Sequence, residues 1–380
     1  MMPMPSLLRK TLLAGFACCT AFTHAGTWPV WRGDPAMTGV AKESLSFPLP
    51  LAWKFEAAKP VKATAVSDGE RYYIGDAKGK FFALAKADGK PAWDFDTKDS
   101  IEGSALLVDG KVVFGTLGGT VYCLDAASGK EAWKFPTQGE IRAAPNVFER
   151  PGQPPLVLIG SYDSHLYALN SKDGTEVWKV ETGDRVNGSA SVAEGMTAFG
   201  GCDGFVYFIN AADGSEAGKV QVKNPIANTV ASHGGLAILA HYGHEVVALN
   251  TKKFEPKWVY KERDFEYFAS PAVTPGGLAF VGDRGKRLHC IGVADGNEKW
   301  AFRATGRIDS SAVVTGDHVV FGCDDGIVYA VSIKDEGNEV WRYEIGQPVQ
   351  SSPCIAAGRM VIAADDGFVY CFGGEKTVAK

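Results

Sequence analysis

Short stretches of alternating apolar and polar residues recur along the chain, each followed by a tight-turn signal. The clearest copy runs from Val121 to Trp133, where an alternating stretch is followed by Ser128-Gly129 and then by Glu-Ala-Trp. Alternation with a period of two predicts a β-strand, and Asp-Gly or Ser-Gly supplies the positive φ of a hairpin turn. Related text occurs at residues 166–174 and 206–214. The pattern therefore predicts an all-β protein built from repeated hairpins.

Tryptophans mark the period of this repeat, because they share one slot in the predicted outermost strand of each unit. They are Trp53, Trp93, Trp133, Trp178, Trp258, Trp300 and Trp341. Gly218 fills the one slot without a tryptophan, and successive slots are 40, 40, 45, 40, 40, 42 and 41 residues apart. A period of about 40–45 residues made of short strands is typical of a propeller blade. Eight slots predict an eight-bladed β-propeller of four-stranded antiparallel blades.

The two ends of the repeat region complement each other. The last unit has three inner strands that end near Phe372, and the first tryptophan strand, residues 53–55, has no inner strands before it. Pairing the two would close the ring and remove two open sheet edges. We therefore expect an entry segment at residues 26–52, a propeller at residues 53–373 and a tail at residues 374–380.

We expect the seven tryptophans to dock between neighbouring blades and to have a structural role. A buried indole removes roughly 150–250 Å² from water, which makes it an effective contact between blades. They are not expected to stack on a cofactor. Gly218 predicts one thinner blade interface.

A second register identifies the residues at the mouth of the central channel. A small residue follows each slot after 11 residues, or 12 after Trp258, and opens the predicted innermost strand. The residue two before it should lie at the mouth, which gives Lys62, Glu102, Arg142, Asn187, Ala227, Phe268, Asp309 and Gln350. Six of these eight are polar and no two are alike, so we consider them candidates for binding a ligand or partner. The alternative is that these side chains are simply solvated at a wet channel mouth.

Loops beside this ring carry aromatic and basic residues. They include Tyr162, His241, Tyr242 and Arg284, and the longer entry after Trp258 adds Phe265, Tyr267 and Phe268. Aromatics with arginine are typical of protein-binding hot spots, although the same rings could pack on one another over the channel. His241 and His244 lie three residues apart in a hairpin without an evident third ligand, so no metal is expected there. No nucleophile elbow, phosphate loop or catalytic triad pattern occurs.

The first 25 residues indicate a cleavable secretory signal. Arg9 and Lys10 precede a short apolar stretch, and small residues end at Ala25, where we expect cleavage. That stretch is too short for a membrane-spanning helix. We therefore expect a periplasmic or extracellular protein without a transmembrane segment, and we keep a lipid anchor as a minority alternative because the residues before Cys18 match a lipobox poorly.

Composition narrows the partners. The chain carries a net charge of −5, and removing the two positive charges of residues 1–25 leaves −7. An acidic chain without basic clusters argues against nucleic acid. We expect a protein partner and a monomeric chain. Six cysteines remain after the signal, and although an oxidising compartment permits disulfides, Cys123, Cys290 and Cys371 occupy one slot in distant units and cannot pair. Most should be buried thiols.

The text from Val121 to Trp133 resembles the repeat signature of the PQQ-like propeller family, which includes BamB-type outer-membrane assembly factors and quinoprotein dehydrogenases. Similar text covers the chain from Trp53 to Phe372, and residues 28–33 are similar to the entry segment of secreted members. BamB-type members are non-catalytic scaffolds. Their resemblance in length and blade number implies a protein-interaction scaffold, although the missing lipobox departs from them.

The dehydrogenase branch of the family implies an alternative. Those enzymes bind PQQ with calcium at the channel mouth and oxidise alcohols or sugars, so the resemblance would give Glu102, Arg142, Asn187 and Asp309 to the cofactor. They also carry a vicinal cysteine pair over the cofactor and long insertions. The only Cys-Cys here, Cys18-Cys19, lies in the predicted signal. We therefore expect no enzyme activity and no cofactor, with a PQQ- and calcium-dependent dehydrogenase as the alternative.

Overall fold

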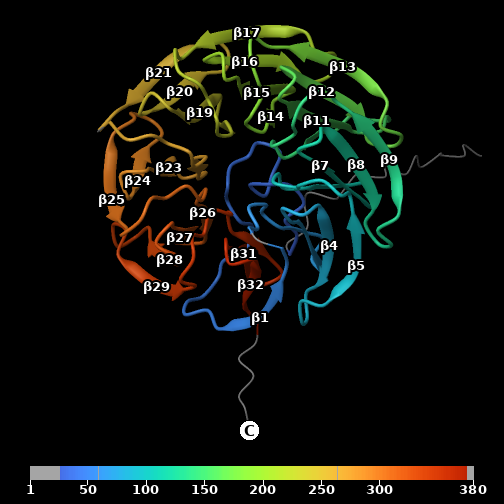
Figure 1. Ribbon diagram of the computed structural model, residues 1–380. Coiled ribbons are helices and arrows are strands. Elements are labelled where there is room, and N and C mark those ends of the chain that lie inside the picture. The colour runs from blue at the N-terminus through green and yellow to red at the C-terminus, as the bar shows by residue number, and fades with distance from the viewer. Residues whose placement is uncertain (1–25, 59, 263, 375–380) are drawn as a thin grey trace, which may run out of the picture.

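A computed structural model describes residues 26–58, 60–262 and 264–374 of the chain. The predicted signal lies outside these residues, as does the end of the predicted tail. The described residues form 32 strands in eight sheets, and every strand pair is antiparallel within a four-stranded sheet. The sheets stand radially around a common centre, with β5, β9, β13 and their counterparts at the rim (Figure 1). The predicted eight-bladed propeller is confirmed.

Each of the first seven blades consists of four consecutive strands, ordered from the channel outwards. Blades one to four contain β2 (Val66–Ser67), β3 (Arg71–Gly75), β4 (Lys80–Ala85) and β5 (Pro91–Asp96); β6 (Leu106–Val108), β7 (Lys111–Gly115), β8 (Thr120–Asp125) and β9 (Glu131–Pro136); β10 (Asn146–Phe148), β11 (Leu156–Ser161), β12 (His165–Asn170) and β13 (Glu176–Glu181); and β14 (Ser191–Ala193), β15 (Met196–Gly200), β16 (Phe205–Asn210) and β17 (Glu216–Gln221).

Blades five to seven repeat this arrangement. They contain β18 (Ala231–His233), β19 (Leu236–His241), β20 (Glu245–Asn250) and β21 (Glu255–Tyr260); β22 (Ala272–Val273), β23 (Leu278–Gly282), β24 (Arg287–Gly292) and β25 (Glu298–Arg303); and β26 (Val313–Thr315), β27 (His318–Gly322), β28 (Ile327–Ser332) and β29 (Glu339–Glu344). The eighth blade combines β30 (Cys354–Ala356), β31 (Arg359–Ala363) and β32 (Phe368–Gly373) with β1 (Leu51–Glu56).

The eighth blade closes the ring as the sequence predicts. Strand β1 pairs antiparallel with β32, placing Trp53 opposite Cys371 and Phe55 opposite Val369. In Figure 1 the blue strand β1 lies at the rim of the red last blade. The start and the end of the repeat region are therefore held in one sheet, with β1 as its outermost strand and β32 paired on both sides.

Tryptophans of the slot contact the next blade in two ways. The indole N–H of Trp133 donates to the main-chain carbonyl of Ser171 at 3.0 Å, and those of Trp53, Trp93, Trp178 and Trp258 make the equivalent bond. The turn glycine of the next blade lies against the ring, so that a Cβ on Gly174 would fall 2.5 Å from the Trp133 ring. Gly174 also has φ of +74°, so both conformation and close approach require glycine here.

At Gly218, in the fourth blade, the interface is filled by a side chain of the fifth blade. Phe254, which takes the position of the turn glycine in the fifth blade, places its ring against Gly218, where a Cβ would come within 2.6 Å of it. The same ring contacts Phe208 with centroids 5.2 Å apart. The expected thinner interface is thus partly made up by an aromatic ring that the neighbouring blade supplies.

The entry segment, residues 26–50, crosses the centre of the ring, where its blue trace is visible in Figure 1. Its last residues run outwards to β1, and the Phe47 ring packs against Trp341 of β29. Main-chain N–H groups of the innermost strands donate to carbonyls of the entry segment at 2.6–2.9 Å, from Ser67, Leu107, Val192, Ser232, Val273 and Val314. The third blade contacts the entry segment through the side chain of Asn146, which donates to the Pro35 carbonyl. The eighth blade contacts it through the main-chain N–H groups of Ala357 and Gly358, which donate to the Glu43 carboxylate. The segment therefore bonds to all eight blades and satisfies edge donors that would otherwise be orphaned in the channel.

Arg32 anchors the entry segment inside the channel. Its side chain is fully buried, and its two terminal nitrogens donate to the carbonyls of Ser311 and Pro271, each at 3.1 Å. Burial lowers the pKa of Arg32 to about 9, with nearby Asp34 opposing the shift. The guanidinium thus links the sixth and seventh blades from the axis.

The cysteines of the described residues are free thiols. Cys123, Cys290, Cys323, Cys354 and Cys371 are buried and Cys202 is partly buried. Burial raises the pKa of Cys123 and Cys290 to about 12. Cys123, Cys290, Cys354 and Cys371 lie in strands, where they pack as small apolar side chains.

Candidate functional site: the channel mouth

A belt of hydrogen bonds fixes the innermost strands where they begin. In seven of the eight blades the small residue that opens the innermost strand has a hydroxyl. This hydroxyl accepts a hydrogen bond from the main-chain N–H of the equivalent residue in the preceding blade. The seven bonds measure 2.8–3.1 Å and accept at Ser104, Ser189, Thr229, Ser270, Ser311, Ser352 and Thr64. The eighth link is missing because Ala144 has no hydroxyl. The belt explains why these positions are small and hydroxylated, and it sets the positions of the residues two before them.

All eight residues that the sequence assigns to the mouth line one cavity of about 200 Å³ above this belt. Trp31 also lines it and is its one contribution from the entry segment. The entry segment bonds to strand residues that lie three positions after the belt residues in sequence, as Ser67 does after Thr64. It therefore closes the channel below the belt, on the side away from the mouth. The mouth is therefore a shallow blind cavity.

Charged residues of the mouth are paired with one another on one side of the cavity. Lys62 Nζ lies 3.2 Å from Glu102 Oε1, and Arg142 forms an ion pair with the other oxygen of Glu102. Arg142 also contacts Glu140 at 2.9 Å. Three consecutive blades are thus joined by a chain of side-chain ion pairs.

On the opposite side the mouth is built from arginine and aromatic rings. Arg284 lies over the Phe268 ring, with its guanidinium carbon 3.3 Å from the centroid, and donates to both oxygens of Asp309 at 3.1 and 2.9 Å. Tyr242 packs on Phe268 with centroids 4.8 Å apart. The bidentate bond holds the guanidinium in place, which presents a fixed amphipathic surface.

Tyr162 extends the ion-paired side of the mouth from Arg142 to Asn187 of the fourth blade. Its hydroxyl donates to Asn187 Oδ1 at 2.8 Å, and the guanidinium groups of Arg142 and Arg185 lie 5.6 and 5.3 Å from its ring centroid. Burial raises the pKa of Tyr162, so the hydroxyl stays protonated at neutral pH. Tyr162, Tyr242 and Arg284 therefore adjoin the mouth residues, as the hairpin register predicts.

Other residues of the predicted loops lie elsewhere. Tyr267 is buried and packs against His289, with ring centroids 6.0 Å apart, inside the sixth blade. His241 is fully buried, and its Nδ1 accepts from the main-chain N–H of Gly243. Burial lowers the pKa of His241, which favours the neutral ring. Phe265 is 40% exposed at the surface.

The sequence did not single out Asn228, which also lines the mouth cavity. Its side chain is only 3% exposed, and neither its Oδ1 nor its Nδ2 has a hydrogen-bond partner among the described residues. A buried amide without partners is costly unless water or a ligand satisfies it. In the other blades the residue one position before the small belt residue is Ala, Gly or Ser. The asparagine in the fifth blade is therefore the sequence feature that could have indicated this site.

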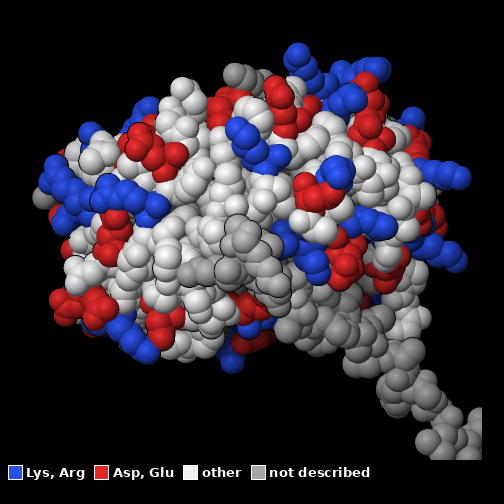
Figure 2. All heavy atoms as spheres, turned by 90° about the horizontal axis from the view of Figure 1, so that it is seen from below, with Lys and Arg blue, Asp and Glu red and all other residues white. Residues whose placement is uncertain are grey.

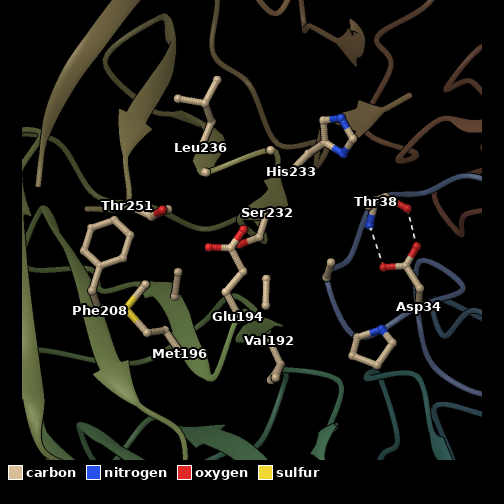
Figure 3. Close-up of a pocket in the computed structure, with 16 residues that line it drawn as sticks. Asp34, Thr38, Val192, Glu194, Met196, Phe208, Ser232, His233, Leu236 and Thr251 are labelled. Carbon is tan, nitrogen blue, oxygen red and sulfur yellow. Dashed lines mark hydrogen bonds between the residues drawn. The ribbon is translucent and has the colours of Figure 1, made fainter. Parts of the chain in front are cut away.

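A second cavity of about 480 Å³ opens where the entry segment meets the hairpins of the fourth and fifth blades. Figure 3 shows Met196, Phe208 and Leu236 on one side and Asp34, bonded to Thr38, on the other. Burial raises the pKa of Asp34. The cavity is mainly apolar, and Glu194 and His233 provide its ionisable groups besides Asp34.

Comparisons with known proteins agree with this architecture. The family described as outer membrane protein assembly factor BamB matches four times, over residues 50–155, 97–183, 162–274 and 266–375. The chain belongs to this family. No curated protein sequence matches it.

Solved structures share the fold at low sequence identity. BamB from Moraxella catarrhalis is 15% identical with a TM-score of 0.73, covering 86% of this chain and 100% of the other. Quinohemoprotein alcohol dehydrogenase from Comamonas testosteroni is 15% identical with a TM-score of 0.78, covering 95% and 82%. A europium-containing methanol dehydrogenase is 14% identical with a TM-score of 0.79, covering 93% and 99%. BamB and two alcohol-oxidising dehydrogenases therefore share this fold, and the fold alone does not choose between a binding protein and an enzyme.

The face shown in Figure 2 is mixed in charge. Basic and acidic side chains alternate over it. The described residues contain no apolar helix of membrane-spanning length.

Proposed function

We propose that this chain is an exported, non-catalytic PQQ-like repeat propeller that acts as a protein-interaction scaffold and binds its partner at the channel mouth. The observation that carries the proposal is the rim formed by Arg284, Phe268 and Tyr242. A guanidinium held by a bidentate carboxylate and stacked on an aromatic ring is preorganised. Contact with such a group costs little side-chain entropy, which is a property of interface hot spots.

The small size of the mouth cavity also favours a protein surface over an enclosed ligand. Small-molecule sites commonly measure about 300–1,000 Å³, whereas this cavity measures about 200 Å³. A partner loop could place one polar group against Asn228 while its flanks cover the rim. That arrangement would give the buried amide the hydrogen bonds that it lacks among the described residues.

The residues present do not fit a quinone cofactor with calcium. PQQ is a tricarboxylate, but the mouth cations Lys62, Arg142 and Arg284 already bind the carboxylates of Glu102 and Asp309. Cysteines of the described residues are dispersed among the blades, without a vicinal pair to cover a cofactor. These features support a scaffold over a PQQ-dependent enzyme.

The experiment is a pull-down from envelope extracts of the native organism with three variants of the tagged protein. We expect the wild-type protein to retain an outer-membrane β-barrel protein. In Arg284→Ala and Arg142→Ala the amount of this partner that is retained should fall at least tenfold. Arg342→Ala is the matched control, because Arg342 lies on the outer strand β29 and bonds Glu339. Equal retention by all variants would refute the mouth as the contact surface.

A parallel assay addresses the alternative. The purified protein is incubated with PQQ and calcium, and dye-linked oxidation of alcohols and sugars is measured. We expect no turnover above the protein-free control. Turnover that disappears in Glu102→Ala or Asp309→Ala would overturn the scaffold proposal.

Mass measurement of the exported chain tests cleavage after Ala25.

A further inference from the structure

A histidine and two glutamates from three different elements converge at the edge of the sixth blade. His289 lies on β24, Glu298 on β25, and Glu262 in the loop that follows β21. His289 Nδ1 is 2.7 Å from Glu298 Oε2 and 4.0 Å from Glu262 Oε2. One ligand atom from each of the three residues lies within 4.8 Å of the others. The side chain of His289 is fully buried, while both glutamates reach the surface.

The histidine departs from the repeat. The same register position holds Phe82, Tyr122, Tyr167, Tyr207, Val247, Tyr329 and Tyr370 in the other blades. Four of those tyrosines donate to an aspartate four residues earlier, as Tyr167 does to Asp163. Gly285 stands at that place in the sixth blade. Both the ring and its partner have therefore changed together.

A buried carboxylate orients the imidazole. His289 Nε2 lies 3.1 Å from Asp283 Oδ2, and Asp283 is only 2% exposed. The other oxygen of Asp283 accepts from the main-chain N–H of Arg287 at 2.7 Å. An imidazole that donates its far nitrogen to a carboxylate turns the near nitrogen towards the two glutamates. Metal-binding histidines are held in this way.

The charges leave room for a cation. Among the described residues, the carboxylates of Asp283, Glu262 and Glu298 lie beside His289. Arg287 forms an ion pair with Glu262 and brings one positive charge to this group. With a neutral imidazole these groups sum to −2, so a divalent ion would balance them.

We propose that His289, Glu262 and Glu298 form a site for Zn²⁺ or a similar divalent transition metal, with Asp283 as the carboxylate that orients His289. Nitrogen and carboxylate ligands lie about 2.0–2.2 Å from zinc, which places tetrahedral ligand atoms roughly 3.3–3.6 Å apart. The present separations of 2.7 and 4.0 Å bracket that value, so only small glutamate movements are needed. Water would complete the tetrahedron, and the Tyr260 hydroxyl, 2.6 Å from Glu298, would retain its bond to that carboxylate.

The position of the site suggests its role. Glu262 belongs to the segment that leaves the fifth blade and runs to Phe268 at the mouth, while His289 and Glu298 belong to the sixth blade. Tyr267, beside Phe268, packs on His289. A metal would tie this segment to the blade and fix the loop that carries the aromatic rim.

The test is calorimetric titration of the EDTA-stripped protein with ZnCl₂, together with metal analysis after gel filtration. We expect one zinc per chain and a zinc-dependent rise in melting temperature. Glu262→Gln and Glu298→Gln should weaken binding at least tenfold, and Asp283→Asn by about 10–100-fold, as loss of an orienting carboxylate does elsewhere. His289→Phe copies Phe82 of the first blade and should abolish binding.

Controls separate this site from adventitious surface binding. His233→Ala removes an imidazole at the end of β18, beside the second cavity, and should bind zinc like wild type. Glu262→Gln alters a surface side chain, so it remains informative if His289→Phe fails to fold. Stoichiometry below half a zinc per chain in wild type, or unchanged affinity in Glu262→Gln and Glu298→Gln, would overturn the proposal.

Discussion

Two blade interfaces of this propeller solve the same packing problem in opposite ways. Between the second and third blades, Trp133 projects from the outer strand and meets Gly174 in the next blade's turn. Between the fourth and fifth blades the outer strand offers Gly218, and the turn offers Phe254. One aromatic ring fills each gap, and one glycine makes room for it.

This exchange shows that the repeat constrains a pair of positions and not either position alone. The cost falls on the turn, since Phe254 adopts φ of +53° where the other blades use glycine. The ring also lacks an N–H, so the bond that Trp133 makes to Ser171 has no counterpart from phenylalanine. We therefore expect the exchanged interface to be weaker than the regular one.

The largest effect should come from the regular interface. Trp133→Ala should reduce the free energy of unfolding by about 3–5 kcal/mol, because it removes a buried indole and leaves a cavity. Urea denaturation followed by circular dichroism measures this change. Phe254→Ala, at a partly buried ring, should cost less, and an equal or greater cost for Phe254→Ala would contradict the ranking.

A double-mutant cycle tests whether the two exchanged residues act as a pair. Gly218→Trp alone should destabilise, because even a Cβ there would lie 2.6 Å from the Phe254 ring. Phe254→Gly alone should destabilise by leaving a gap. The double variant recreates the regular arrangement, so we expect a favourable coupling of about 1–3 kcal/mol in denaturation experiments. Additive losses would mean that the fifth blade cannot accommodate an indole.

The regularity of the repeat also decides how much could be predicted from the sequence. Ring closure, blade number and the residues of the mouth followed from spacing, because every blade repeats one backbone. Departures from the repeat were harder to interpret. Phe254 and His289 occupy positions whose neighbours come from another strand or blade, and single-residue spacing carries no information on such contacts. The entry segment has no repeat, so its course through the channel and the burial of Arg32 could not be derived.

The hydrogen-bond belt offers a further comparison, between a link that is present and one that is missing. Ser189 accepts from the main-chain N–H of Ala144 at 2.9 Å in a buried setting. Ser189→Ala should cost about 1–3 kcal/mol of unfolding free energy, since a buried donor loses its acceptor. Thermal and urea denaturation measure it. Stability unchanged within error would show that water replaces the hydroxyl.

The smallest expected effect is a gain. Ala144→Ser would supply the missing acceptor to the main-chain N–H of Ser104 and complete the belt, and residue 144 lines the mouth cavity, where a hydroxyl finds space. We expect a rise of about 0.5–1.5 kcal/mol in unfolding free energy, the net value of one hydrogen bond. Unlike the exchange at Gly218 and Phe254, this departure has no partner that makes up for it, so restoring one residue should suffice. A loss of stability would indicate that the alanine is itself required, most directly because the hydroxyl disturbs the Arg142 side chain two residues earlier and its ion pair with Glu102.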